Sequence, residues 1–283
     1  MSSQSHPRAS HESQYYPSFV GTSIAFIRMG FQATTSYPMG FAVSQLGPIA
    51  GIIAMFFLQR IVRSGPIVGG NYLSFVVLGV IGQSLVGGAF QGVGIELDAA
   101  IQQGRLEMLL IEPIRWPTIP AALGLWPIIL SCAQVTLTLC VGIGLGMHIS
   151  LIGALCAVPL AAAASLSGLG VGVLAGSVRV LAKRSDPVWL IYSIVSGLVG
   201  GIAVPINLLP LPLRGLSWCL PTMYVNSGLR KLMMPHAQGI YGPNGLWATV
   251  VMWLALVPLA TLATIAFNRS VNVGRRLGVL AGY

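Results

Sequence analysis

Long apolar runs, each of about 20 residues or more, repeat along this chain and leave it few ways to fold. In lipid, backbone N–H and C=O groups must find hydrogen-bond partners within the protein, so an isolated spanning segment has to be helical. The pattern of membrane β-strands, about ten residues of alternating polarity, does not occur. Mean hydropathy is +0.81, and only 7% of residues are charged, against about 25% in soluble domains. The sequence therefore predicts an all-α polytopic membrane protein.

The apolar runs predict six membrane-spanning helices within one transmembrane domain, residues 18–270. A flexible cytoplasmic tail, residues 1–17, precedes this domain, and a second cytoplasmic tail, residues 271–283, follows it. The third and fourth runs nearly touch, which predicts a tight helical hairpin. The expected spans are residues 38–59, 72–95, 117–147, 150–178, 187–209 and 246–267.

An apolar stretch before the first span, residues 19–37, carries Arg28 at its centre. It fits an amphipathic helix that lies on the membrane, with Arg28 reaching for lipid phosphates. An extension of the first span fits the same pattern equally well. The sequence leaves both arrangements open.

The distribution of basic residues predicts the orientation in the membrane. With both termini in the cytoplasm, ten Lys and Arg residues fall on the cytoplasmic side and five on the outside. Cytoplasmic loops are normally the more basic ones, so we expect a multi-pass cell-membrane protein with both termini inside. The net charge of +9 is scattered over many loops, without the basic stripe of a nucleic-acid-binding surface. We therefore expect membrane lipids as partners, and no nucleic acid.

The predicted spans contain no Asp, Glu, Lys, Arg or His residue. Proton-driven pumps and symporters usually carry such titratable groups inside the membrane, so energy for transport would enter from outside the lipid. The polar groups in the spans are amides and hydroxyls, among them Gln45, Gln83, Gln91 and Gln134. They suit hydrogen bonds between helices or a substrate path. Glycines spaced by four, as at Gly168 and Gly172, predict close helix packing.

Four of the six acidic residues gather in one short polar segment, residues 96–116, which we call the acidic island. Residues 98–111 can form a short amphipathic helix, which Pro113 and Pro117 would end. Such a helix, joined rigidly to two spans, would convert a push from a soluble partner into helix tilt. A solvated loop with satisfied charges is the alternative from the residues alone. The four acidic residues are Glu96, Asp98, Glu107 and Glu112.

Two segments of the chain carry recognisable motifs. In the acidic island the matching residues are Gly104, Leu106, Glu107, Leu109, Leu110 and Pro113. Before the last span the matching residues are Pro205, Leu209, Pro210, Leu213, Pro221, Thr222, Tyr224, Leu229 and Arg230. In this order, and with six spans, they resemble the signature of ABC-2 type transporter permeases, the membrane subunits of bacterial-type ABC exporters. The resemblance covers about residues 19–270.

This resemblance implies a permease that works with a separate cytoplasmic ATP-binding cassette subunit. A second permease copy, either identical or paralogous, would complete a dimer. The chain has no G-x-x-x-x-G-K-[ST] phosphate loop, so it would be no enzyme by itself and would bind no cofactor. ATP and Mg would bind to the partner subunit. The residues expected to couple to that subunit are Arg105, Leu106, Glu107, Leu109, Leu110 and Pro113.

The same resemblance implies short re-entrant helices at the outer face before the last span. Pro205, Pro210, Pro212 and Pro221 suit such broken helices. The chain departs from the family in one respect. Between Asp98 and Gln103 it lacks the basic residue expected before the signature glycine.

The substrate is less constrained than the mechanism. Aromatic residues make up 8% of the chain and are scattered within the spans, unlike the stacking aromatics of polysaccharide channels. We therefore expect export of a drug, lipid or other amphiphile, with a polysaccharide or glycolipid as the alternative. The candidate path residues are Met55, Phe56, Gln83, Gln91, Trp189 and Tyr192.

The sequence disfavours two other classes of membrane protein. A secondary transporter or channel without an ATPase is disfavoured by the absence of ionisable residues in the predicted spans. A membrane enzyme is disfavoured because the four His residues form no metal or acyl-transfer spacing, and no site for a metal is expected.

Overall fold

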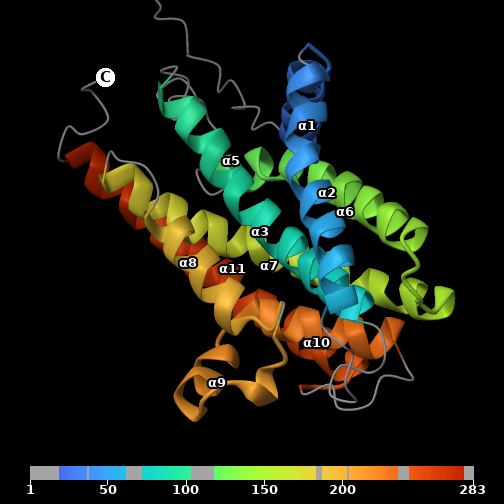
Figure 1. Cartoon of the computed structure of the whole chain (residues 1–283). Helices are drawn as coiled ribbons and strands as arrows, with labels where there is room; N and C mark the ends of the chain where they lie inside the picture. Colours follow the sequence, from blue (N-terminus) through green and yellow to red (C-terminus); the bar gives the residue numbers. More distant parts are fainter. Residues whose placement is uncertain are drawn as a thin grey trace, which may run out of the picture.

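The protein folds as a bundle of helices (Figure 1). The computed structural model describes residues 19–36, 38–61, 72–102, 118–182, 187–202, 204–234 and 242–276, and these ranges contain helices and no strand. The helices are α1 (Phe19–Ser36), α2 (Pro38–Ile61), α3 (Tyr72–Gln102), α5 (Thr118–Leu123), α6 (Leu125–Gly144), α7 (Leu151–Ala182), α8 (Pro187–Val199), the 3-10 helix η2 (Ile206–Leu208), α9 (Leu211–Ser217), α10 (Pro221–Met233) and α11 (Gly245–Arg276).

Five helical stretches within the described ranges are long and apolar enough to cross a membrane. They confirm the predicted all-α, multi-pass class. Residues 145–150 connect α6 to α7, but the two helices pack mainly on α3 and hardly on each other, so the predicted tight hairpin is not confirmed. The five stretches are Pro38–Gln59, Tyr72–Ala100, Ile119–Gly144, Leu151–Arg179 and Gly245–Gly274.

A sixth continuous span is not confirmed. The expected fifth span, residues 187–209, is α-helical only in the 13 residues of α8. A helix of that length extends about 20 Å, whereas the hydrocarbon core is about 30 Å thick. The chain leaves the helix at Gly200, and Gly201 adopts a left-handed φ of 72°. Pro205 then adopts an extended conformation before η2.

Three expected spans also have different ends in the structure. The expected span 117–147 is divided into α5 and α6 at Gly124. Helices α3 and α7 continue beyond residues 95 and 178, because hydropathy marks the apolar part of a helix and not its last hydrogen bond. The spanning stretches therefore do contain ionisable residues near their ends, which corrects the sequence-based expectation. These residues are Glu96, Asp98, Arg179 and Arg269.

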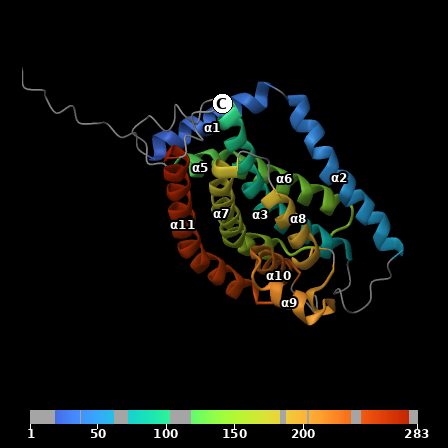
Figure 2. The same cartoon turned by 90° about the vertical axis from the view of Figure 1, so that its left-hand side faces the viewer.

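Helix α1 is a separate helix from α2. It ends at Ser36, and α2 begins at Pro38. In Figure 2, α1 lies across one end of the bundle, while α2 descends along its edge. This arrangement favours the amphipathic surface helix over a straight extension of the first span.

Helix α3 lies at the centre and packs against α6, α7, α8 and α10 (Figure 2). Its contact with α7 is close because glycines on α7 face the α3 backbone. A Cβ at Gly168 would overlap the carbonyl oxygen of Val86, and one at Gly172 would lie 3.0 Å from that of Phe90. The predicted glycine packing is thus confirmed between these two helices. Fully buried side chains such as Leu78 and Leu160 fill the neighbouring core.

The close contact between α3 and α7 predicts that one added methyl group at Gly168 destabilises the protein. Gly168→Ala should lower the free energy of unfolding by about 1–3 kcal/mol, because neither backbone can give way without shifting a helix. The matched control is Gly197→Ala on α8, where an added Cβ meets nothing within 4 Å. Thermal unfolding of the full chain in detergent measures both. Equal melting temperatures for the two variants would contradict the proposed packing.

Candidate functional site

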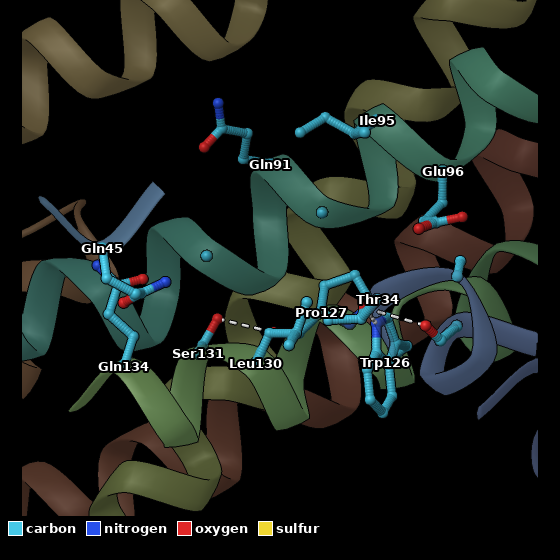
Figure 3. A pocket seen from close by; sticks show the side chains of 14 residues that line it. Thr34, Gln45, Gln91, Ile95, Glu96, Trp126, Pro127, Leu130, Ser131 and Gln134 are labelled. Carbon is cyan, nitrogen blue, oxygen red and sulfur yellow. Dashed lines mark hydrogen bonds between the residues drawn. The ribbon is translucent and has the colours of Figure 1, made fainter. Parts of the chain in front are cut away.

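A cavity of about 420 Å³ lies between α1, α2, α3 and α6. Three side-chain amides line it, together with two hydroxyls and one carboxylate. In Figure 3, Gln45 and Gln134 lie toward one end, and Glu96 lies toward the other, near Trp126 and Thr34. The lining residues are Gly30, Ala33, Thr34, Gln45, Gly88, Gln91, Gly92, Ile95, Glu96, Trp126, Pro127, Leu130, Ser131 and Gln134.

Small residues allow the cavity walls to approach each other. A Cβ at Gly88 would overlap the Ser131 hydroxyl, and one at Gly92 would overlap the Pro127 ring. Helix α6 therefore lies directly on α3 beside the cavity. Gly30 plays the same part on α1, because a Cβ there would overlap Trp126.

The hydroxyl groups of the cavity are already engaged in fixing its walls. The Trp126 indole N–H donates to Thr34 Oγ1 at 3.1 Å, and the Thr34 hydroxyl donates to the Gly30 carbonyl at 3.0 Å. The Ser131 hydroxyl donates to the Pro127 carbonyl at 2.8 Å. Of these bonds, the one between Trp126 and Thr34 joins α6 to α1, and the other two lie within single helices.

The amides of Gln91 and Gln134 make no hydrogen bond within the described part of the chain. Gln91 is exposed although it lies well inside the spanning stretch Tyr72–Ala100. An amide that meets lipid without a partner costs several kcal/mol, so this side of α3 is expected to face something polar.

The other candidate path residues fall into two further groups. Gln83, Trp189 and Tyr192 lie at the contact of α3 with α8. The Ser196 hydroxyl donates to Gln83 Oε1 at 3.0 Å. The ring of Phe90 lies 5.2 Å from that of Trp189 and 5.0 Å from that of Tyr192. These contacts join α3 to α8, and a place of these side chains on a substrate path stays a prediction.

Met55 and Phe56 lie neither at the cavity nor at the contact between α3 and α8. Both lie near the opposite end of α2 from Gln45. Phe56 packs partly buried against the main core and contacts Phe57 edge to face at 5.7 Å. Of the six candidate path residues, only Gln91 lines the cavity.

An ion pair joins α3 to α7 near the end of α3. Arg179 Nη1 lies 3.2 Å from Asp98 Oδ2, and the side chains are 7% and 34% exposed. The guanidinium reaches this position by passing over Gly94, where a Cβ would lie 2.8 Å from its central carbon. The sequence offered no basic partner for Asp98 in the following residues. The structure supplies one from α7.

Most of the acidic island lies outside the described residues. Residues 98–102 continue α3, so the first part of the expected short helix 98–111 belongs to a longer one. The roles of Gly104, Arg105, Leu106, Glu107, Leu109, Leu110 and Pro113 stay predictions.

The segment of residues 205–230 folds as short helices that begin at prolines. Pro205 and Pro210 precede η2 and α9, and Pro221 is the first residue of α10. The ring of Tyr224 packs edge to face on Trp218 at 5.9 Å. These breaks agree with the expected pattern, while re-entry into a membrane remains a prediction.

Arg230 is the polar centre of this segment. Its Nε and Nη2 donate to the Phe75 carbonyl at 3.1 and 2.9 Å, and Nη2 also donates to the Ile202 carbonyl at 2.8 Å. The guanidinium lies 3.5 Å from the centroid of the Phe75 ring. Burial lowers the pKa of Arg230 to about 9, so the group still carries its proton at neutral pH. Next to it, Asn226 Nδ2 donates to the Gly200 carbonyl at 2.8 Å.

The sequence did not single out Trp126, Leu130 or Ile95 as site residues. Trp126, Leu130 and Gln134 recur every four residues on α6, and Gly88, Gly92 and Ile95 follow one another at spacings of four and three on α3. This spacing places each set on one helix face and could have indicated a shared cavity. No comparable local signal identifies Arg179 as the partner of Asp98.

Comparison with known proteins adds one finding. A family model described as ABC-2 type transporter matches residues 24–234, about three quarters of the chain. This region begins in α1 and ends directly after α10. No curated protein matches the chain.

The ion pair predicts that the two charges depend on each other. Asp98→Asn leaves the buried Arg179 charge without its carboxylate and should lower the free energy of unfolding by about 3 kcal/mol. The exchanged pair, Asp98→Arg with Arg179→Asp, should recover most of this loss. Thermal unfolding of both variants in detergent tests the pair. Measuring Asp98→Arg and Arg179→Asp alone completes the cycle, and an exchanged variant that loses the sum of the two single losses would show that the contact contributes nothing.

Arg230 predicts a penalty for even a conservative change. In Arg230→Lys a single nitrogen replaces the fork that bonds two carbonyls, which should reduce stability by about 1.5–3 kcal/mol. Arg269→Lys on the exposed side of α11 is the matched control and should melt like the unchanged protein. A wild-type melting temperature for Arg230→Lys would contradict the role assigned to the fork.

Proposed function

The chain belongs to the ABC-2 type transporter family, and we propose that it is the permease subunit of an exporter driven by a separate ATP-binding cassette subunit. The family match is the observation that carries this proposal. The domain that it identifies is a permease domain, which carries no ATPase of its own. The five apolar helical stretches agree with a membrane subunit.

Helix α3 has the geometry to carry a movement from one end of the bundle to the other. Its 31 residues extend about 46 Å as one helix. Asp98 near its C-terminal end pairs with Arg179, and the Phe75 carbonyl near its N-terminal end accepts bonds from Arg230. We propose that the ATPase acts on the acidic island, which begins in the last turns of this helix, and that α3 transmits the displacement to α10.

A second permease copy, identical or paralogous, is part of the proposal. Helix α2 has few contacts with the other described helices, and Cβ atoms at Gly47 and Gly51 would meet nothing in the described ranges within 4 Å. The exposed amide of Gln91 lies on the neighbouring helix and needs a polar environment. Lipid would satisfy the apolar surface of α2 but not this amide. A second copy that encloses an aqueous path with the first would satisfy both.

An amphiphile, such as a drug or a lipid, remains the proposed substrate, moved outward. The aromatic rings of Phe90, Trp189 and Tyr192 pack on one another and do not form an open stacking platform for sugars. The cavity volume of about 420 Å³ falls within the range of about 300–1,000 Å³ for small-molecule sites. Export of a polysaccharide or glycolipid is the second candidate.

Binding of the ATPase tests the proposal. We expect the full chain to co-purify with an ATP-binding cassette subunit encoded beside it and to stimulate its ATP hydrolysis. Glu107→Arg with Leu109→Asp should abolish both, because it reverses a charge and places a carboxylate at a packing position of the acidic island. The amount of bound ATPase and its rate of ATP hydrolysis are the measurements.

Arg276→Glu, an exposed residue at the end of α11, is the control for a reversed charge elsewhere in the chain. It should leave the complex intact. Undiminished binding and stimulation in the Glu107 and Leu109 variant would refute the coupling role of the acidic island.

A further inference from the structure

The end of the bundle that holds the start of α3 together with α9 and α10 contains basic residues and no acidic one, and we call it the acid-free end (Figure 1). We propose that Lys231 and Arg214 at this end bind the phosphate of a lipid whose headgroup is negatively charged overall. The inference goes beyond the proposed function. It concerns the membrane around the protein and holds with or without an ATPase.

Every acidic residue of the chain is attached to the opposite end of the bundle. Two of the six lie in the last two turns of α3, and the others precede α1, follow α3 in the acidic island or directly precede α8. They are Glu12, Glu96, Asp98, Glu107, Glu112 and Asp186. Along α3, Glu96 follows Phe75 by 21 residues, or about 31 Å, whereas screened charges interact over about 8 Å. The carboxylates are therefore too distant to balance charge at the acid-free end.

Positive charge at the acid-free end is thus not neutralised by the chain itself. Arg230 is only 3% exposed, and its guanidinium meets two backbone carbonyls and the Phe75 ring. Lys231 and Arg214 also donate to backbone carbonyls. A carbonyl orients a cation but leaves its net charge unchanged. An anion that balances these charges has to come from another molecule.

The position of Lys231 and Arg214 makes a lipid phosphate that anion. Both side chains are half-buried, so part of each reaches the surface. Trp218, directly after α9, and Trp247, in the first turn of α11, are 42% and 61% exposed. Exposed Trp residues are enriched where a membrane meets water, which places the acid-free end among the lipid headgroups. Lys and Arg can reach a phosphate there while their methylene groups stay against apolar surface.

The absence of carboxylates selects among headgroups. Phosphatidylcholine carries a quaternary ammonium beside its phosphate, and no acidic residue at the acid-free end can receive this cation. Phosphatidylglycerol carries the same phosphate with uncharged hydroxyls. The buried charge of Arg230 strengthens this preference without contacting the lipid, because a charge acts over a longer range where the dielectric constant is low.

Photolabelling of the full chain in nanodiscs tests the assignment. Two probe lipids, phosphatidylglycerol and phosphatidylcholine, carry the same photoreactive group next to the phosphate and are added at equal mole fractions. The phosphatidylglycerol probe should label the peptides that contain Lys231 and Arg214 about fivefold more strongly, the effect of about one cation near an anionic surface. The ratio should fall toward one as the salt concentration rises from about 0.05 to about 0.5 M.

A double variant examines the two cations. Lys231→Gln with Arg214→Gln should reduce phosphatidylglycerol labelling to the level of phosphatidylcholine. Glutamine keeps an N–H donor for the carbonyl that each cation bonds, so the local fold is retained. Arg269→Gln, exposed near the other end of α11, is the matched control. It should leave labelling at the acid-free end unchanged.

Inorganic phosphate distinguishes a lipid from a free ion as the source of the bound phosphate. At matched ionic strength it should compete with the phosphatidylglycerol probe no better than chloride does. Three results would overturn the proposal: equal labelling by the two lipids, undiminished labelling in the double variant, and stronger competition by phosphate than by chloride. None of them involves the ATPase, so failure of this proposal leaves the proposed exporter standing, and the reverse also holds.

Discussion

The close approach of α7 to α3 is the contact on which the rest of the bundle depends. It exists because Gly168 and Gly172 present no side chain where the two backbones meet. In lipid there is no hydrophobic force to draw apolar helices together, so close packing of small residues supplies the attraction. With α7 fixed in this way, Arg179 comes within reach of Asp98, and α11 finds its place on the other side of α7.

The same central helix carries two chemically different faces. Toward α8 it presents Gln83 and Phe90, which are used in hydrogen bonding and ring packing. Toward α2 and α6 it presents Gly88, Gln91 and Gly92, where small residues allow close walls and an amide remains available. One helix thus joins a packed contact to an open cavity. A rotation or tilt of α3 would change both at once.

The sequence predicted the helices well because run length and apolarity are properties of each segment alone. It did not predict where they end. Residues 187–209 are almost uniformly apolar, yet Gly200, Gly201 and Pro205 stop the helix within that stretch. These glycine and proline residues were visible in the sequence, but a prediction from mean hydropathy does not take helix-ending residues into account.

The candidate site was predicted only in part, for a related reason. Gln91 could be named as a polar residue within a span. Its grouping with Gln134 and Glu96 depends on how α3 and α6 are rotated against each other, and no single segment contains that information. The partner of Asp98 was missed in the same way, because Arg179 lies on a different helix, distant in sequence.

The early end of α8 has a consequence for how this region can vary among related proteins. Where the helix stops, the carbonyls of Gly200 and Ile202 lose their intrahelical donors, and the side chains of Asn226 and Arg230 on α10 replace them. A backbone turn and a distant helix therefore share one hydrogen-bonding requirement. A change of length or composition at residues 200–202 must be matched on α10, so these two stretches are expected to evolve together as one unit.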